Sequence, residues 1–176
     1  PRLGWFLMEL PATVVFLVIY FSGSHRFEAV PLFFLGIWLL HYGNRGFYFP
    51  LRLRVERGAT ARFGWLVVIS GWLVTGLHGY LNAAFFSELG GHYSLEWFRD
   101  PRFVIGVLLY LVSLAFNIHS DGILRNLRTP EELVSGKKIY RIPKGGLFEY
   151  VSCPSYTTEI LAWIGFAVAT WSLGAV

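Results

Sequence analysis

The stretch "FGWLVVISGWLVTGLHGYLNAAFF", residues 63–86, decides the class of fold. Its 24 residues include no Asp, Glu, Lys or Arg. As a helix it would extend about 36 Å, enough to cross the hydrocarbon core of a bilayer with some tilt. Of the 176 residues in the chain, 55% are hydrophobic and only 15% are charged, whereas about a quarter are charged in a soluble domain. We therefore predict an all-α integral membrane bundle.

Five apolar segments predict five membrane spans within a single transmembrane domain. They cover about 5–21, 30–49, 63–86, 103–121 and 159–176, and a long loop, about 122–158, precedes the last. The sequence begins with Pro1 rather than Met and stops at Val176 inside an apolar run. We expect the natural protein to extend beyond both ends.

The distribution of basic residues predicts the orientation of the spans. Loops 50–62 and 122–158 together hold ten Lys and Arg residues, whereas loops 22–29 and 87–102 hold three. Cytoplasmic loops of membrane proteins carry the excess of basic residues, so both basic loops are predicted to be cytoplasmic. The net charge of +4 then reflects topology, and we expect neither a nucleic-acid partner nor an obligate protein partner.

The cysteine and histidine residues do not indicate a metal site. Cys153 is the only cysteine, which excludes an internal disulfide and a multi-cysteine zinc site. His25, His92 and His119 lack the paired spacing of metal ligands. His78 is a lone histidine in an apolar span, which is typical of an interhelical hydrogen-bonding residue. We therefore predict no metal and leave His78 outside the functional site.

The segment "NIHSDGILRNLR", residues 117–128, places polar residues at helical spacing after an apolar run. Asn117, Asp121, Arg125 and Arg128 have offsets of 0, 4, 8 and 11. At roughly 100° per residue they fall within an arc of about 80°. The pattern predicts a helix whose polar face lies at the cytoplasmic edge of the membrane.

Ionisable residues at membrane depth are candidates for a functional site. Glu9 lies in "GWFLMELPATVVFLVIY", and Tyr42 lies in "HYGNRGFYFPLR", where the spacing lets His41, Tyr42 and Arg45 share a helix face. The first two spans bring Glu9 and Tyr42 to the same side of the bilayer. A carboxyl group and a phenol near one cavity can polarise and protonate a substrate oxygen. The alternatives are an interfacial carboxylate for Glu9 and an aromatic-belt residue for Tyr42.

The end of the long loop, "KKIYRIPKGGLFEYVSCPSYTTE" at 137–159, is too apolar and aromatic for a solvated linker. Gly145 and Gly146 permit a tight turn or a close approach of the backbone to a ligand. The basic residues that could surround phosphate groups are Arg125, Arg128, Arg141 and Lys144. No Walker A or G-x-G-x-x-G motif is present, so topology and anionic lipids remain an alternative role for these residues.

Glu159 stands directly before the last apolar run. Together with Asn117 and Asp121 it suits the binding of amides and hydroxyls. An interhelical hydrogen-bond network is the alternative for the same three residues.

Taken together, these segments resemble the steroid 5α-reductase family in order and over nearly the whole chain. "WFLMELP" at 5–11 resembles its first motif, and "HYGNRGF" at 41–47 resembles its His-Tyr-x-x-Arg motif. "NIHSDGILRNLR" resembles its Asn-x-x-Ser-Asp-x-x-Leu-Arg-x-Leu-Arg segment. "YRIPKGGLFEYVSCPSYTTEILAWIGFAVATWS" at 140–172 resembles its long loop and following helix. The resemblance implies a bacterial-type homologue with seven spans in the full protein.

The resemblance also implies an activity, in which NADPH reduces the 4,5 double bond of a 3-oxo-Δ4 steroid. Glu9 and Tyr42 would hydrogen-bond the C3 carbonyl oxygen, and Trp5 would join them in binding the substrate. Hydride would pass to C5 while Tyr42 stabilises or protonates the enolate, and C4 would take its proton from water. Charge that develops on oxygen needs positioned donors in a dry cavity, and the cofactor supplies the hydride.

The same resemblance implies which residues bind the cofactor. They are Arg45, Asn117, Asp121, Arg125, Arg128, Tyr140, Arg141, Ser155 and Glu159, with Arg52 and Arg54 as further candidates for phosphate contacts. Members of the family usually carry Asn where Ser155 stands. The implied location is a multi-pass protein of the bacterial inner membrane or the endoplasmic reticulum, with the cofactor site facing the cytoplasm. Its partners would be a steroid or similar lipid and the membrane lipids.

Three other functions stay open from the sequence. One is a related reductase of an enoyl thioester or a polyprenol. The second is a membrane S-adenosylmethionine-dependent methyltransferase, because "SCPSYTTE" is similar to the His-Pro-x-Tyr-x-x-Glu segment of isoprenylcysteine-type enzymes. Those enzymes do not require Glu9 or the pair His41-Tyr42. The third is a non-catalytic lipid-binding or scaffold protein, which leaves the polar face at 117–128 unexplained.

Overall fold

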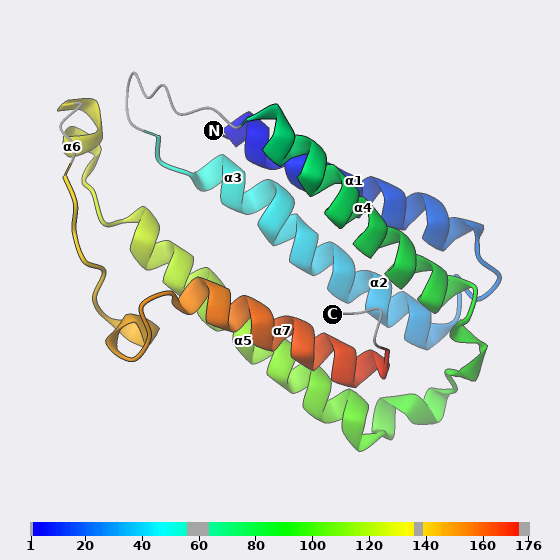
Figure 1. The fold of residues 1–176 in the computed structure, drawn as a ribbon. Helices are drawn as coiled ribbons and strands as arrows, with labels where there is room; N and C mark the ends of the chain where they lie inside the picture. The colour runs from blue at the N-terminus through cyan, green and yellow to red at the C-terminus, as the bar shows by residue number, and fades with distance from the viewer. Residues whose placement is uncertain (1, 56–63, 136–138, 173–176) are drawn as a thin grey trace.

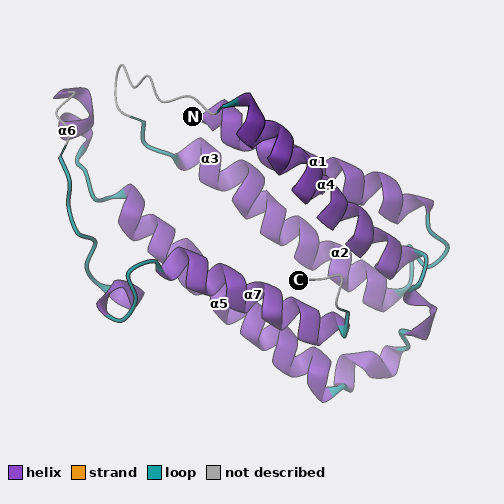
Figure 2. Ribbon diagram, viewed as in Figure 1, coloured by secondary structure: helices purple, strands orange, loops and turns teal. Residues whose placement is uncertain are grey.

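The fold is helical throughout the part of the chain that the structure describes (Figure 2). The structure is a computed structural model, and it describes residues 2–55, 64–135 and 139–172. Within these ranges the segments are helices, turns and loops, and none is a β-strand. The prediction of an all-α membrane bundle is confirmed.

Among the described residues, five helical stretches form the bundle. They are α1 (Arg2–Ser22), α2 (Ala29–Tyr42), α4 (Trp65–Ser87), α5 (Pro101–Arg125) and α7 (Pro154–Thr170). At its end α2 continues through a π-helical turn, Gly43–Tyr48, into the short α3 (Phe49–Arg52). Of the helices described, α1, α4 and α5 are long and apolar enough to cross a membrane. The number of spans remains a prediction.

Several helices begin earlier than the apolar runs suggest, and α5 and α7 show why. Helix α5 begins at Pro101 because the side chain of Asp100 accepts a hydrogen bond from the backbone N–H of Arg102 at 2.8 Å. An aspartate N-cap followed by proline is a strong helix start. Helix α7 begins at Pro154, five residues before the expected boundary at Glu159. Its first turn is polar, so hydropathy places its start too late.

The long loop is also more structured than its composition indicates. It contains a short helix, α6 (Pro130–Ser135), and a 3₁₀ turn, Gly146–Glu149. At the start of α6, the backbone N–H of Thr129 donates to the Glu132 carboxylate at 2.8 Å, and the N–H of Glu132 donates back to the Thr129 hydroxyl at 3.3 Å. This reciprocal pair is a capping box, and it starts a helix where a loop was expected.

Helix α2 lies between two closely packed pairs, α1 with α4 and α5 with α7 (Figure 1). The ring of Phe34 lies 5.1 Å from that of Phe86 on α4 and 5.9 Å from that of Phe166 on α7. One turn later, Trp38 stacks on Phe16 of α1 at 4.4 Å. Large buried rings dominate the energetics of such a core. The side chains of α2 therefore join the two pairs.

Glycines let the backbones of α5 and α7 come into direct contact. A Cβ added at Gly106 would lie 2.4 Å from the backbone nitrogen of Ala169, and one added at Gly165 would lie 2.7 Å from the carbonyl oxygen of Gly106. No side chain fits into these spaces. Small residues commonly form such interfaces between helices in membranes.

The described residues that flank the two basic connections lie at one end of the bundle. This end holds the start of α1, the end of α3, α6 and the loop that leads to α7 (Figure 1). The short connections before α2 and before α5 lie at the opposite end. The arrangement agrees with the predicted grouping of the loops, while the side of the membrane remains a prediction.

Candidate active site

The π-helical turn begins directly after Tyr42 and occupies the segment predicted to be functional. Its sequence, "GNRGFY", includes Gly43 and Gly46, and glycine lowers the helix propensity of a segment. Gly46 is buried, and a Cβ added there would lie 3.4 Å from the Cβ of Glu9. Single π turns inside helices are frequent at functional sites. This turn brings the end of α2 against Glu9 on α1.

Two neighbouring residues at the end of α2 contact different helices. The Nε2 atom of His41 lies 3.1 Å from an oxygen of the Glu159 carboxylate on α7. The hydroxyl of Tyr42 lies 3.3 Å from Nδ1 of His78 on α4. His41 and Tyr42 thus tie α2 to both pairs of helices.

Arg45 points in a third direction, because it lies within the π turn. Its guanidinium lies over the rings of Trp5, at 4.8 Å, and Phe49, at 5.3 Å. The indole of Trp5 donates to the backbone carbonyl of Arg45 at 3.3 Å. The α-helical spacing that placed His41, Tyr42 and Arg45 on one face does not hold here, since residues 43–48 wind more widely.

The predicted substrate-binding pair is buried inside the bundle. Glu9 is 9% exposed and Tyr42 is 5% exposed. The ring of Trp38 lies 4.8 Å from that of Tyr42, and the ring of Trp163 lies 6.3 Å from it. Charges and dipoles act more strongly in such an apolar setting than in water. The structure thus places both Glu9 and Tyr42 in the interior of the bundle.

Asn117 and Asp121 bind the first turn of α7 through an interhelical network. The amide nitrogen of Asn117 lies within hydrogen-bond distance of the Ser155 carbonyl, the Thr158 hydroxyl and the Glu159 carboxylate, at 2.8, 3.1 and 3.3 Å. The hydroxyl of Ser155 donates to Asp121 at 2.8 Å. The alternative of an interhelical network is therefore realised, and it includes Glu159.

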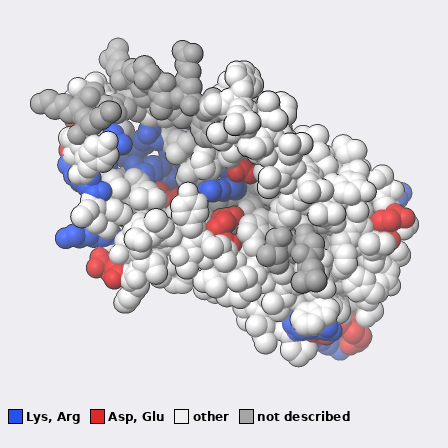
Figure 3. All heavy atoms as spheres, in the orientation of Figure 1, with Lys and Arg blue, Asp and Glu red and all other residues white. Residues whose placement is uncertain are grey.

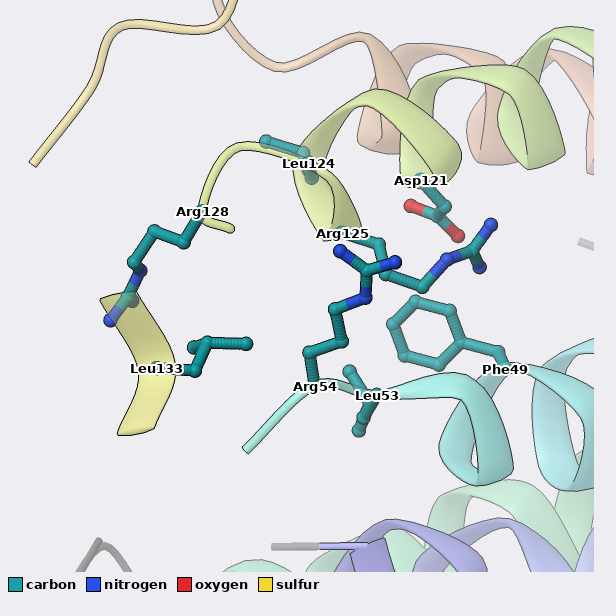
Figure 4. A pocket seen from close by; sticks show the side chains of 8 residues that line it. All are labelled: Phe49, Leu53, Arg54, Asp121, Leu124, Arg125, Arg128 and Leu133. Carbon is teal, nitrogen blue, oxygen red and sulfur yellow. The ribbon is translucent and has the colours of Figure 1, made fainter. Parts of the chain in front are cut away.

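A cavity of about 260 Å³ opens at the basic end of the bundle, beside Asp121 (Figure 4). It is lined by Phe49, Leu53, Arg54, Asp121, Leu124, Arg125, Arg128 and Leu133. Arg54 and Arg125 extend into the space next to Asp121, and Arg128 lies farther out, towards Leu133 (Figure 4). Basic side chains also surround a hollow at this end in the space-filling view (Figure 3).

The arginines of the cavity suit a ligand with several negative charges. Within residues 2–55, 64–135 and 139–172, neither Arg54 nor Arg125 forms a salt bridge. Guanidinium groups bind phosphate through paired hydrogen bonds, and a polyanion would offset their mutual repulsion. The donor set therefore fits the phosphates of a dinucleotide. Arg52, a further candidate, instead donates to the Tyr48 hydroxyl and does not line the cavity.

Helix α5 ends one turn before the predicted polar face does. Its last residue is Arg125, and Asn126 forms the C-cap. The expectation that Arg128 belongs to the helix is wrong, because the chain turns after Leu127 and begins α6 at Pro130. Arg128 nevertheless lines the same cavity as Arg125.

Tyr140 and Arg141 lie outside the lining of this cavity. Arg141 donates to both carboxylate oxygens of Glu132 and, at 2.7 Å, to the carbonyl of Leu127. The hydrogen bonds from Arg141 lower the pKa of Glu132 to about 2, so the pair stays ionised at neutral pH. Tyr140 is 88% exposed. Arg141 thus attaches the loop to α6, and the cofactor contacts of both residues remain predictions.

The glycine pair of the loop turns the chain against α5. Gly145 and Gly146 have φ angles of 88° and 56°, which favour glycine. A Cβ added at Gly146 would lie 2.7 Å from the His119 ring. Gly146 therefore makes the close approach, and it makes it to His119.

Comparison with known proteins identifies the family. A family model described as 3-oxo-5-alpha-steroid 4-dehydrogenase matches residues 63–176, more than half of the chain. The chain belongs to this family. Glu9 and Tyr42 precede the matched region, but they lie within the longer alignments to individual relatives.

Three such relatives align with nearly the whole chain. It is 38% identical over 174 residues to 3-oxo-5-alpha-steroid 4-dehydrogenase 1 of Homo sapiens, covering 98% of this chain and 63% of that protein. It is 40% identical over 177 residues to 3-oxo-5-alpha-steroid 4-dehydrogenase 2 of Sus scrofa, covering 99% and 65%. It is 37% identical over 172 residues to steroid 5-alpha-reductase DET2 of Gossypium hirsutum, covering 98% and 65%. The chain spans less than two thirds of the length of these relatives.

Sequence reasoning missed two residues of the site in this 3-oxo-5-alpha-steroid 4-dehydrogenase family member. His78 was predicted to be an interhelical hydrogen-bonding residue and is one, but its partner is Tyr42, so it lies beside the site from which it was left out. Trp163 donates to Glu159 at 3.1 Å, and its ring lies 4.5 Å from that of His41 and 4.7 Å from that of His78. Trp163 stands four residues after Glu159, one helical turn away, and this spacing was the available signal.

Proposed function

We propose that the full protein is an NADPH-dependent steroid 5α-reductase that reduces the 4,5 double bond of 3-oxo-Δ4 steroids. The observation that carries the proposal is the burial of both Glu9 and Tyr42, with Tyr42 next to the ring of Trp38, in a member of this family. Relatives over nearly the whole chain are named for the same activity. The proposal includes a cofactor site that faces the cytoplasm.

The roles of Glu9 and Tyr42 follow from their donor groups. The phenol of Tyr42 donates to the C3 carbonyl oxygen of the substrate, and Glu9 donates there in its protonated form, since an ionised carboxylate only accepts. NADPH, when bound, supplies the hydride that C5 receives. Negative charge then grows on the C3 oxygen, where positioned donors in a dry site stabilise it. A proton from water at C4 completes the addition of two hydrogens.

The cofactor residues form a continuous path to this pair. Arg54, Arg125 and Arg128 hold phosphate at the cavity, beside Asp121. Hydrogen bonds then connect Asp121 to Ser155, Ser155 to Asn117 and Asn117 to Glu159. Glu159 in turn pairs with His41, the residue before Tyr42. This arrangement suits a dinucleotide whose phosphates bind at the arginine cavity and whose nicotinamide binds near His41 and Tyr42.

The proposal is tested with the full-length protein in nanodiscs. NADPH oxidation is followed with and without a progesterone-like 3-oxo-Δ4 steroid, and the product is identified by mass. We expect steroid-dependent oxidation and a product heavier by two hydrogens. NADPH binding without steroid turnover would favour an enoyl or polyprenol substrate. Binding of S-adenosylmethionine in place of NADPH would favour the methyltransferase.

We expect Asp121→Ala to weaken NADPH binding roughly 10- to 100-fold, the range for losing a hydrogen bond to a charged group. The carboxylate lies at the junction of the arginine cavity and the network to Glu159. Titration calorimetry of the variant in nanodiscs measures the Kd. Turnover at saturating NADPH should fall much less.

Two further variants control this result. Ser155→Ala removes one hydrogen bond but keeps the carboxylate of Asp121, so its effect on Kd should be smaller. Glu96→Gln alters an exposed carboxylate at the opposite end of the bundle and should leave Kd unchanged. An unchanged Kd in Asp121→Ala would remove Asp121 from the cofactor site.

A further inference from the structure

We infer that His78 is a positioning residue, which donates a hydrogen bond from Nδ1 to the Tyr42 oxygen and so directs the Tyr42 proton to the substrate. The inference rests on the proposed function, since it assigns a role beside Tyr42. It also adds a residue of α4 to the site, although none of the family motifs identified in the sequence lies on α4.

The geometry around Tyr42 leads to His78. The Tyr42 hydroxyl is buried, and within the described ranges His78 is its only hydrogen-bond partner, with 3.3 Å between the hydroxyl oxygen and Nδ1. A buried phenol without a partner would be costly. The burial of Tyr42 therefore depends on a residue of α4.

The surrounding packing holds the His78 ring in place. The ring of Trp38 lies 5.1 Å from it, and that of Trp163 lies 4.7 Å from it. The neighbouring Gly79 lets α4 approach α1 closely, because a Cβ there would lie 3.0 Å from the carbonyl oxygen of Ala12. His78 thus comes from a closely packed helix, and its ring packs against two tryptophans that also pack against each other.

The chemistry selects one direction for the hydrogen bond. The Tyr42 hydroxyl has one hydrogen and can also accept. If Tyr42 donated to His78, no hydrogen would be left for the C3 oxygen of the substrate. If Nδ1–H of His78 donates instead, the Tyr42 hydrogen points away from His78, and the charge that grows on the Tyr42 oxygen is stabilised. His78 keeps its own proton throughout, so it acts only through Tyr42.

Paired substitutions separate this role from simple packing. His78→Leu removes the donor, whereas His78→Asn places an amide N–H near the position of Nδ1. We expect His78→Leu to lower kcat roughly 10- to 100-fold, the range for a hydrogen bond to a group that gains charge, with the Kd of NADPH unchanged. His78→Asn should recover most of kcat. Wild-type kcat in the leucine variant, or equal losses in both, would overturn the inference.

A measurement without turnover tests the hydrogen bond itself. Nitrogen NMR of ¹⁵N-histidine-labelled full-length protein in nanodiscs reports which ring nitrogen carries hydrogen, and the His78→Asn spectrum assigns the His78 signals. We expect a protonated Nδ1 in His78 whose resonance shifts in Tyr42→Phe. An unprotonated Nδ1, or a resonance that does not respond, would overturn the inference. The expected signals in a protein that fails to reduce the steroid would instead count against the proposed function alone.

Discussion

Replacement of Tyr42 by phenylalanine is expected to lower kcat roughly 100- to 1,000-fold, the range for losing one donor to a developing oxyanion. The phenyl ring keeps the contacts with Trp38 and Trp163, so the fold should persist. The variant loses only the hydroxyl, which would donate to the C3 oxygen. The Kd of NADPH should stay within about twofold, because the arginine cavity lies at the basic end of the bundle and Tyr42 does not line it. Single-turnover kinetics and titration calorimetry measure the two quantities.

A matched control shows whether the loss is specific to this hydroxyl. Tyr93 is also buried, and its hydroxyl donates to the carbonyl of Thr170 at 2.7 Å, in another part of the bundle. Tyr93→Phe removes a buried hydrogen bond of the same kind and should cost about 1 kcal/mol of stability without lowering kcat. Equal kcat values for Tyr42→Phe and the wild type would exclude Tyr42 as the donor. A parallel loss of NADPH binding would instead indicate a structural role.

The class of fold and the polar contacts between α5 and α7 follow from local patterns in the sequence. Long uncharged runs predict membrane helices because the cost of burying charge in lipid is a property of each segment. The offset between Asn117 and Asp121 is also local, and it predicts the shared helix face from which both contact α7. The sequence also contains a local signal for the start of α6. Thr-x-x-Glu with a proline at the first helical position predicts a helix start, and Thr129 and Glu132 form this capping box.

The centre of the site depends on tertiary packing and could not be predicted in the same way. His78 is near Tyr42 only because Gly79 lets α4 approach α1, and no pattern in either segment indicates that pairing. The prediction that Arg45 shares a helix face with Tyr42 assumed α-helical spacing. Residues 43–48 instead form a π-helical turn, so Arg45 points in another direction. Two glycines indicated that the helix is weak here, but they did not predict a π-helical turn.

The contact between α5 and α7 is the basis of the second large effect. Gly106→Leu is expected to lower the stability of the protein by at least about 3 kcal/mol, the upper part of the range for overpacking. The new side chain would meet the backbone of α7 at Ala169 and Gly165. Backbone atoms cannot rotate away as a side chain can, so the two helices must separate. Thermal unfolding in detergent, followed by size-exclusion chromatography, measures the loss.

Gly36→Leu is the matched control, because it makes the same change in helix α2. Nothing lies within 4 Å of a Cβ added at Gly36, and the residue is exposed on the surface of the bundle. We expect it to keep wild-type stability. The contrast also bears on function, since Asn117 reaches Ser155 only while α5 and α7 stay in contact. Gly106→Leu should therefore lose NADPH binding together with stability, and normal NADPH binding in that variant would show that the network to Glu159 does not depend on this contact.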